Sequence, residues 1–332
     1  MTDWNYYLII WIIFKFVNGV RRLSMANLSK RDNKLGVRVA RNIDLYIFLV
    51  PTVLYFIIFN YVPMAGIQLA FKKYNAVRGI WASPFIGFKN FIDFFNYYQF
   101  WQIIRNTLTL SVYQLVLNTI IPFVLALLIN QLPSKRFKKI VQTITYAPHF
   151  ISVIVLVGVM YIFMSPSSGL INHVIRSLGG NAVFFFGESS ILPHIYVWSG
   201  VWQNAGWGTI IYLAALSNVS PDLHEAAMVD GASKLQRIRH IDVPGILPTA
   251  IILLILHTGR IMSVSFQKVF LMQTSLNISA SEVISTYVYK AGLLQYRFEY
   301  STAVELFNSV INLILIVTVN KIARSLDQSS LW

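Results

Sequence analysis

Six long apolar stretches constrain this chain more than any other feature of its sequence. They lie approximately at residues 44–71, 103–130, 140–164, 193–216, 245–270 and 301–322. A helix needs about twenty predominantly apolar residues to cross the hydrocarbon core of a bilayer, and each stretch is long enough. The sequence therefore predicts an all-α membrane protein with six transmembrane helices.

The overall composition agrees with membrane insertion. Hydrophobic residues make up 56% of the 332 residues and charged residues 12%, whereas charged residues form about 25% of an ordinary soluble domain. The net charge of +14 could indicate nucleic-acid binding, but the basic residues form short clusters between apolar stretches, as membrane topology requires. We therefore expect no nucleic-acid partner. The absence of cysteine excludes disulfides, thiolate nucleophiles and zinc–thiolate sites.

The basic residues also predict the orientation in the membrane. If the N-terminus is cytoplasmic, seventeen lysines and arginines fall in the inside segments and seven in the outside segments. Cytoplasmic segments carry such an excess of positive charge. We therefore expect a multi-pass protein with both termini, and the connection at 220–244, in the cytoplasm.

The N-terminal region precedes the first predicted span. Trp4 to Val17 is apolar but short and is interrupted by Lys15, so we expect a helix lying in the membrane interface. A seventh crossing is the alternative; a secretory signal is disfavoured, because Asp3 stands where basic residues are usual. The expected organisation is a terminal segment at 1–42, one transmembrane domain at 43–324 and a tail at 325–332.

The connection at 220–244 is more polar and more ordered than a simple linker requires. Ser220 is a suitable N-cap and Pro221 suits the first helical position. Gly231 favours a turn that ends this helix. A second short helix is expected at 232–241, with Pro244 stopping it. The segment is thus predicted to fold as a helix-turn-helix.

Seven residues of this connection form a recognisable pattern: Glu225, Ala226, Ala227, Asp230, Gly231, Ile241 and Pro244. The pattern and its spacing resemble the EAA loop of permease subunits of ATP-binding-cassette importers, with Val243 where leucine is usual. The resemblance covers residues 43–324. Four segments near its start (45–51, 61–64, 68–75 and 87–91) resemble the branch that imports complex oligosaccharides and is related to maltose permeases.

The resemblance implies a type I importer in the bacterial cytoplasmic membrane. Its implied partners are a second, homologous permease, two cytoplasmic ATPase subunits and an extracytoplasmic solute-binding lipoprotein. The EAA loop would carry closure of the ATPases to the membrane helices. The chain contains no Gly-x-x-x-x-Gly-Lys-Ser/Thr cradle for phosphates, so we expect it to be no enzyme and to bind no cofactor, with ATP and Mg held by the ATPase.

Polar side chains within apolar stretches are costly and should face a cavity or a partner helix. The predicted substrate-path residues are Trp198, Trp202, Gln203 and Asn204 in the fourth span, His257 and Arg260 in the fifth, and Asn308 in the sixth. Hydrogen bonding between helices is the alternative role, and we favour it for Gln114, Asn118 and Asn312. Arg260 has two open roles, pairing with Glu305 or contacting substrate.

These residues suggest a sugar as cargo. Amides can bind hydroxyls and indole rings can pack on the apolar faces of sugars. His257 and Arg260 would suit an acidic oligosaccharide through charge-assisted hydrogen bonds. A non-sugar solute remains an alternative within the same family. A secondary transporter would need intramembrane carboxylates, which the spans almost lack apart from Glu305, and a membrane enzyme would need a catalytic pair.

Overall fold

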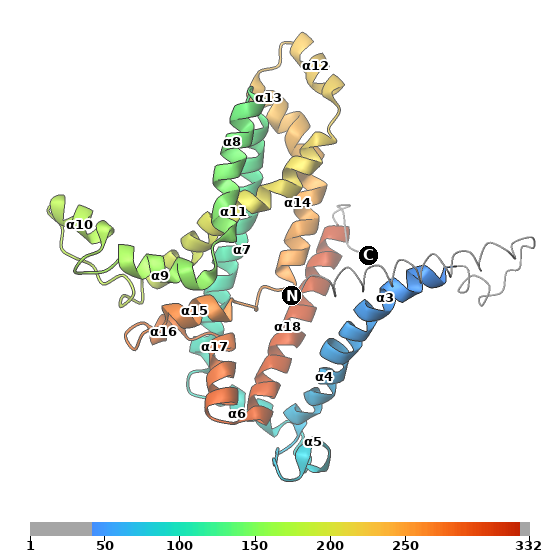
Figure 1. Ribbon diagram of the computed structural model, residues 1–332, viewed down its shortest axis with the longest axis vertical. Coiled ribbons are helices and arrows are strands. Elements are labelled where there is room, and N and C mark those ends of the chain that lie inside the picture. Colours follow the sequence, from blue (N-terminus) through green and yellow to red (C-terminus); the bar gives the residue numbers. More distant parts are fainter. Residues whose placement is uncertain (1–41, 326–332) are drawn as a thin grey trace, which may run out of the picture. The chain divides into compact units, whose positions relative to one another are not determined.

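The computed structural model describes residues 42–325, which are mostly helical (Figure 1). Across these residues there is no strand, and a single isolated bridge joins Lys72 to Phe85. The chain divides into two compact units, Met1–Ile67 and Gln68–Trp332. The predicted interfacial helix at Trp4 to Val17 and the tail after residue 325 lie outside the described residues.

The described part of the first unit is a helical rod. It consists of α3 (Ile43–Phe56), a widened π-helical turn (Ile57–Tyr61) and α4 (Val62–Met64). With the following turn it forms a candidate span, Leu45–Phe71, none of whose apolar window is buried in the protein. Such a helix has no protein core to pack into, and lipid is the solvent that its apolar surface suits. The first predicted span is therefore confirmed as a helix.

The second unit is built on four long helices. They are α7 (Phe100–Asn130), α11 (Leu192–Ser217), α14 (Val243–Thr258) and α18 (Phe298–Ser325). Among residues 42–325, four helices are long and apolar enough to cross a membrane, or five if one bent pair is counted as a span. Helix α11 lies where the fourth span was predicted, but it is not among these candidate membrane-crossing helices. The count of six spans stays a prediction.

The third predicted span is not one straight helix. Helix α8 (Lys135–Tyr146) leads into a tight turn (Ala147–Phe150), and α9 (Val153–Phe163) leaves at 96° to the first direction. Pro148 lies within the turn, and Ser152 then caps α9 by accepting a hydrogen bond from the Val155 amide. A proline followed by a new N-cap ends one helix and begins another.

The fifth span was predicted to reach residue 270, and this boundary is wrong. Helix α14 ends at Thr258, and a turn leads to the short α15 (Phe266–Met272). The side chain of Asn312 in α18 accepts a hydrogen bond of 3.0 Å from the Met262 amide in this turn. Asn312 therefore stabilises irregular backbone between the helices, which is close to the helix-joining role expected for it.

Short helices occupy the two ends of the second unit (Figure 1). At one end lie α12 (Pro221–Val229) and α13 (Lys234–Arg237). Toward the other end are α5 (Gly79–Ala82), α6 (Lys89–Phe95), α16 (Ile278–Ser281) and α17 (Ile284–Tyr289), while α10 (Leu170–Ser177) follows α9. The long helices thus separate the 220–244 loop from the connections predicted to lie outside.

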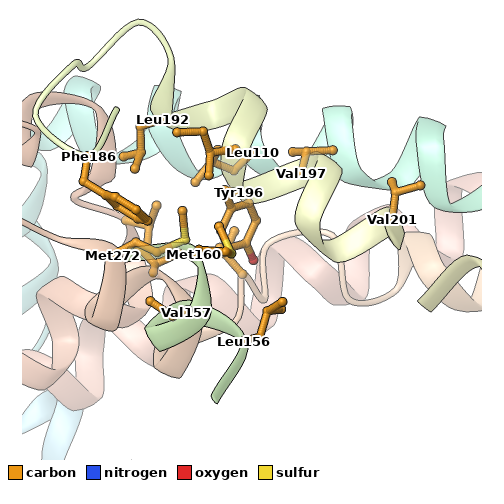
Figure 2. Close-up of a cluster of buried hydrophobic side chains, with 14 of the residues drawn as sticks. Leu110, Leu156, Val157, Met160, Phe186, Leu192, Tyr196, Val197, Val201 and Met272 are labelled. Atoms are coloured by element: carbon orange, nitrogen blue, oxygen red, sulfur yellow. The ribbon is translucent and has the colours of Figure 1, made fainter. Parts of the chain in front are cut away.

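The largest buried cluster forms where α7, α9, α11 and α15 meet (Figure 2). Leu110 of α7, Met160 of α9 and Tyr196 of α11 are among its members, and Met272 comes from α15. Phe186, from the connection before α11, is 1% exposed and stacks on Tyr161 with centroids 3.9 Å apart. This core fixes the broken span against α7 and α11, and so positions one side of the polar cavity described below.

Candidate functional site

The 220–244 segment begins with the predicted helix and turn. Ser220 Oγ accepts a hydrogen bond of 3.3 Å from the Asp222 amide at the start of α12. After α12, Gly231 has φ +78°, and its amide donates to Met228 O at 3.1 Å. The Ala232 amide donates to Ala227 O at 2.8 Å. This pair of bonds is a Schellman motif, which requires the left-handed backbone that glycine adopts without strain.

The second helix of the segment differs from its prediction. Ser233 and Gln236 form a reciprocal capping box at the start of α13, with bonds of 2.7 and 3.4 Å. Pro244 was expected to stop this helix, but the helix continues through it, and Lys234–Thr258 is one candidate span. A π-helical turn at Ile238–Asp242 precedes the proline, and the Val243 amide bonds to Ile238 O, five residues back. This wider turn accommodates the missing proline N–H.

The pattern residues of the loop lie mainly at its surface. Glu225, Ala226 and Asp230 are exposed, and a Cβ added to Gly231 would meet no atom within 4 Å. Backbone conformation, and not lack of space, therefore explains glycine at 231. Ile241 and Pro244 line a hollow of about 470 Å³ at the base of α12. The loop thus presents small and charged side chains on a rigid helical frame.

A polar cavity lies between α7 and the chain that follows α14. Its volume is about 250 Å³. The lining residues are Ser111, Gln114, Leu115 and Asn118 of α7, with His257, Arg260, Ile261, Ser263, Val264 and Ser265. Two basic side chains, two amides and three hydroxyls therefore face one space at intermediate depth in the long helices.

Two of these polar groups have buried atoms without partners. Ser111 Oγ and Asn118 Oδ1 make no hydrogen bond with any described residue. Buried polar atoms are nearly always hydrogen-bonded, because an unpaired one costs about 1–3 kcal/mol. Both residues line the cavity, but these two atoms are themselves buried and are not presented to its open space, so the helix-joining role predicted for Asn118 stays a prediction.

Gln203 and Asn204 lie at the break between α8 and α9 and are not among the residues that line this cavity, and their substrate-path role stays a prediction. The Gln203 amide donates to Ile151 O at 2.7 Å, and His149 Nδ1 lies 3.0 Å from Asn204 Oδ1. The His149 ring also stacks on Trp207, with centroids 4.5 Å apart and planes 7° apart. These side chains of α11 hold the backbone at the break between α8 and α9 and do not line the cavity.

The other predicted path residues are dispersed. Trp198 and Trp202 are about half exposed on one face of α11, outside the cavity lining. Asn308 is buried, and its amide donates to Glu305 Oε1 at 3.3 Å. Arg260 does not pair with Glu305, since the ion pairs among residues 42–325 are His224–Asp242 and Lys290–Glu282. Arg260 lines the polar cavity instead, and its contact with a solute stays a prediction.

Some lining residues were not among the predicted ones. Ser111 stands with Gln114 and Asn118 at intervals of three and four, which place the three on one face of α7. The spacing of these polar residues in an otherwise apolar helix could have predicted their shared polar face. Ser263 and Ser265 carried no such signal, because they were placed inside a continuous helix that in fact ends at Thr258. Within the described ranges, no group of three acidic or histidine side chains could hold a metal ion.

Known proteins resemble the chain over most of its length. Residues 118–328 match the family described as binding-protein-dependent transport system inner membrane component. Protein LplB of Bacillus subtilis (strain 168) is 41% identical over 288 residues, which cover 87% of this chain and 91% of LplB. The polygalacturonan/rhamnogalacturonan transport system permease protein YteP of the same strain is 37% identical over 303 residues, covering 91% of this chain and 94% of YteP.

Two solved structures share the fold. A chain of a bacterial ABC transporter involved in the import of the acidic polysaccharide alginate superposes with a TM-score of 0.81 at 39% identity, covering 88% of this chain and 98% of that one. In the bacterial alginate ABC transporter in complex with an alginate pentasaccharide-bound periplasmic protein, the match has a TM-score of 0.82 at 38% identity over 90% and 99% of the two chains.

The family match contains the C-terminal part of α7, the broken span, α11, the helical loop, α14 and α18, while Ser111, Gln114 and Leu115 of the cavity lining lie before it. These elements also recur across nearly the whole length of the solved relatives. The chain therefore belongs to the binding-protein-dependent transport system inner membrane components and is the non-catalytic permease subunit of an ATP-binding-cassette importer, whose ATPase is a separate polypeptide.

Proposed function

We propose that this permease imports oligosaccharides that carry acidic sugar units, and that the cavity between α7 and the chain after α14 is its half of the translocation path. The observation that carries the proposal is the combination of groups around that cavity. Arg260 and His257 can bind carboxylates, and Gln114, Asn118 and Ser111 can bind hydroxyls. A uronate offers both kinds of group on one ring.

The free groups in the cavity favour a polar cargo. Ser111 and Asn118 line the cavity, and each has a buried polar atom that no described residue satisfies, so a rotation of either side chain would present that atom to a sugar hydroxyl. Arg260 is exposed toward the cavity and pairs with no carboxylate among the described residues. A guanidinium at such depth is costly without a counter-charge, and an anionic cargo supplies one during its passage.

The relatives support the same cargo class. YteP is named for transport of polygalacturonan and rhamnogalacturonan, and the structurally similar transporter imports the acidic polysaccharide alginate. The exposed rings of Trp198 and Trp202 on α11 provide apolar surfaces on which sugar rings could stack. We propose that these rings contact the cargo where the second permease completes the path.

Uptake by the reconstituted transporter tests the cargo. Arg260→Ala should lower uptake of an oligogalacturonate about tenfold or more, because a charge-assisted hydrogen bond contributes about 1.5–3 kcal/mol, and should affect a neutral oligosaccharide much less. Arg136→Ala is the matched control, since Arg136 is an exposed arginine of α8 outside both the cavity lining and the 220–244 loop. An equal loss for both sugars would remove the basis for an acidic cargo.

The helical loop at 220–244 is the proposed contact with the ATPase. Its exposed residues Glu225, Ala226 and Asp230 would seat in a groove of that subunit, with the small side chains allowing close approach. Its second helix continues directly into α14, so a displacement of the loop is transmitted to a helix next to the cavity. ATP then shifts the transporter between states by binding one of them better.

Two variants test this contact. Glu225→Lys reverses an exposed charge, and Gly231→Pro is incompatible with φ +78° and removes the amide that bonds to Met228 O. Both should leave the protein in the membrane while lowering uptake per ATP hydrolysed. Normal coupled uptake by both variants would show that this loop is not the ATPase contact.

The proposed assembly follows the family. Two permeases, this chain and a homologue, would join two ATPase subunits that hold ATP and Mg, and a solute-binding lipoprotein would dock on the outer connections of a domain at 43–324. Both termini would face the cytoplasm. The chain has no cysteine, so single introduced thiols can be tested with a membrane-impermeant maleimide. Labelling of Met228→Cys from outside intact cells would contradict this orientation.

A further inference from the structure

We propose that Asp242 is a positioning residue that ties the helical loop to both walls of the polar cavity, through His224 on one side and Gln131 on the other. The proposal rests on the proposed coupling role of the 220–244 loop. It assigns a function to the buried end of that loop. This function is separate from that of the exposed surface, which would contact the ATPase.

Asp242 joins three elements that are distant in sequence. It lies in the π-helical turn just before α14 and has 0% exposure. Its Oδ1 lies 3.2 Å from His224 Nε2 of α12, whose side chain is 24% exposed. Its Oδ2 accepts a hydrogen bond of 2.9 Å from Gln131 Nε2, at the C-cap of α7. One carboxylate therefore contacts α12, α14 and α7.

Burial makes these contacts necessary. A carboxylate removed from water costs several kcal/mol unless it is paired and hydrogen-bonded. Oδ1 makes no well-aligned hydrogen bond with any described residue, and its charged or polar contact is the His224 imidazole at 3.2 Å. If α12 moved away from α14 or α7, the carboxylate would lose a partner without gaining water. The three elements are thus favoured to move together.

The two helices held by Asp242 are the ones that border the cavity. Ser111, Gln114 and Asn118 lie on α7, while His257 and Arg260 lie at the end of α14 and just after it. The loop is covalently continuous with both α11 and α14, so along the chain a displacement of α12 by the ATPase reaches α7 only by way of these two helices. Through Gln131, the same displacement also reaches α7 directly. The cavity walls then respond as a unit to the state of the ATPase.

The experiment measures access to the cavity in the complete transporter, without requiring knowledge of the cargo. Ser263→Cys places a single thiol in the cavity lining of a chain that has no other cysteine. The rate of its labelling by a small maleimide is measured in liposomes with and without ATP and Mg. ATP hydrolysis and co-purification of the ATPase are measured on the same samples.

In the parent protein, ATP should change the labelling rate. Asp242→Ala should strongly reduce this ATP-dependent change in labelling rate, while the ATPase still binds and hydrolyses ATP. Coupling between sites typically amounts to roughly 5- to 150-fold, and the loss should lie in that range. Asp242→Asn keeps the size of the side chain and an oxygen that can accept from Gln131, which guards against a folding defect; it should cause a smaller loss in the same direction. His224→Ala combined with Asp242→Ala should lose no more than Asp242→Ala alone, because both remove one interaction.

The outcomes distinguish the positioning role of Asp242 from the proposed coupling role of the 220–244 loop. Lys321→Gln is the charge control and should keep the full response, since it removes an exposed charge of α18 outside the loop and the Asp242 contacts. If Glu225→Lys abolishes the ATP response while the Asp242 variants keep it, the positioning role of Asp242 is wrong and the coupling loop stands. If Glu225→Lys, Gly231→Pro and the Asp242 variants all keep the full response, both proposals are wrong.

Discussion

The side-chain amide of Gln203 donates a hydrogen bond of 2.7 Å to the carbonyl oxygen of Ile151, at the break between α8 and α9. A break in a membrane-embedded helix leaves carbonyls and amides that water cannot reach, and such backbone is tolerated only where protein groups satisfy it. Gln203, 7% exposed, fills that need from the neighbouring α11. A polar residue in an apolar span can therefore satisfy a backbone group at a bend in another helix.

Replacing Gln203 by Leu should destabilise the protein. The substitution removes the donor from Ile151 O, and an unpaired buried group costs about 1–3 kcal/mol. We expect a lower midpoint of thermal unfolding in detergent. Ile211→Ala, on an exposed face of the same helix, is the control and should shift the midpoint much less. Equal shifts for the two variants would show that the bond does not support the break.

A side chain at Gly206 should disrupt the same region more severely. An added Cβ would lie 2.0 Å from Thr145 O and 2.4 Å from Thr145 C, so α8 and α11 would have to separate. Gly206→Ala should lower the yield of folded, detergent-stable protein. Gly158→Ala in α9, where no atom lies within 4 Å of the new Cβ, should be tolerated. A stable Gly206→Ala protein would mean that this helix contact is looser than described.

Asn277 should be needed to join the connections at the predicted outer end. It is fully buried, and its Nδ2 donates at 2.8 Å to both Phe186 O and Met272 O. Asn277→Ala leaves these carbonyls without that donor, and we expect a loss of about 1–3 kcal/mol, seen as faster proteolysis of the outer connections. Asn181→Ala, an exposed amide, should cleave at the parental rate; matching rates for both would refute the role.

Tyr287 should make stability fall at alkaline pH. Burial, followed by its hydrogen bond to Tyr300, raises the pKa of the Tyr287 hydroxyl, whereas an unfolded tyrosine has a pKa of about 10. The folded state therefore holds this proton more tightly. The resulting stabilisation is complete below about pH 10 and is lost as pH rises toward the folded pKa.

Tyr287→Phe tests this dependence. The variant should lose less stability between about pH 9 and 11 than the parent, even though it is less stable at neutral pH because the buried Tyr300 hydroxyl loses its 2.8 Å partner. Thermal midpoints measured across that range provide the comparison. Tyr98→Phe is the control, since Tyr98 is 83% exposed. Identical slopes for the parent and Tyr287→Phe would rule out the linkage.

Much of the loop at 220–244 could be predicted from local sequence. Ser220, Pro221 and Gly231 act through their own backbone neighbours, and the structure confirms the cap, the first helical turn and the left-handed turn. Pro244 was misjudged, because whether a proline stops a helix depends on the turn before it. Here a π-helical turn, with the Val243 amide bonded to Ile238 O, carries the helix through the proline.

The sequence identified the polar residues within the apolar stretches, but it did not show which of them face a cavity and which bond to another helix. An amide in a span faces either a cavity or another helix, and both cases have the same composition and spacing. Contacts across the fold give them different surroundings: Gln203 bonds to the broken span, whereas Asn118 lines the cavity. His257 and Arg260 share that cavity, which supports their proposed role.

The sequence by itself determined that this chain is a helical membrane protein with a capped helix-turn-helix between its fourth and fifth apolar stretches, because apolar length, caps and a left-handed glycine act through near neighbours. Only the tertiary structure decided where the spans break, which polar groups meet around the cavity, and that Asp242 contacts both His224 and Gln131. The contact between Gln131 and Asp242 alone joins residues 111 positions apart, and no local pattern encodes the distance between such residues.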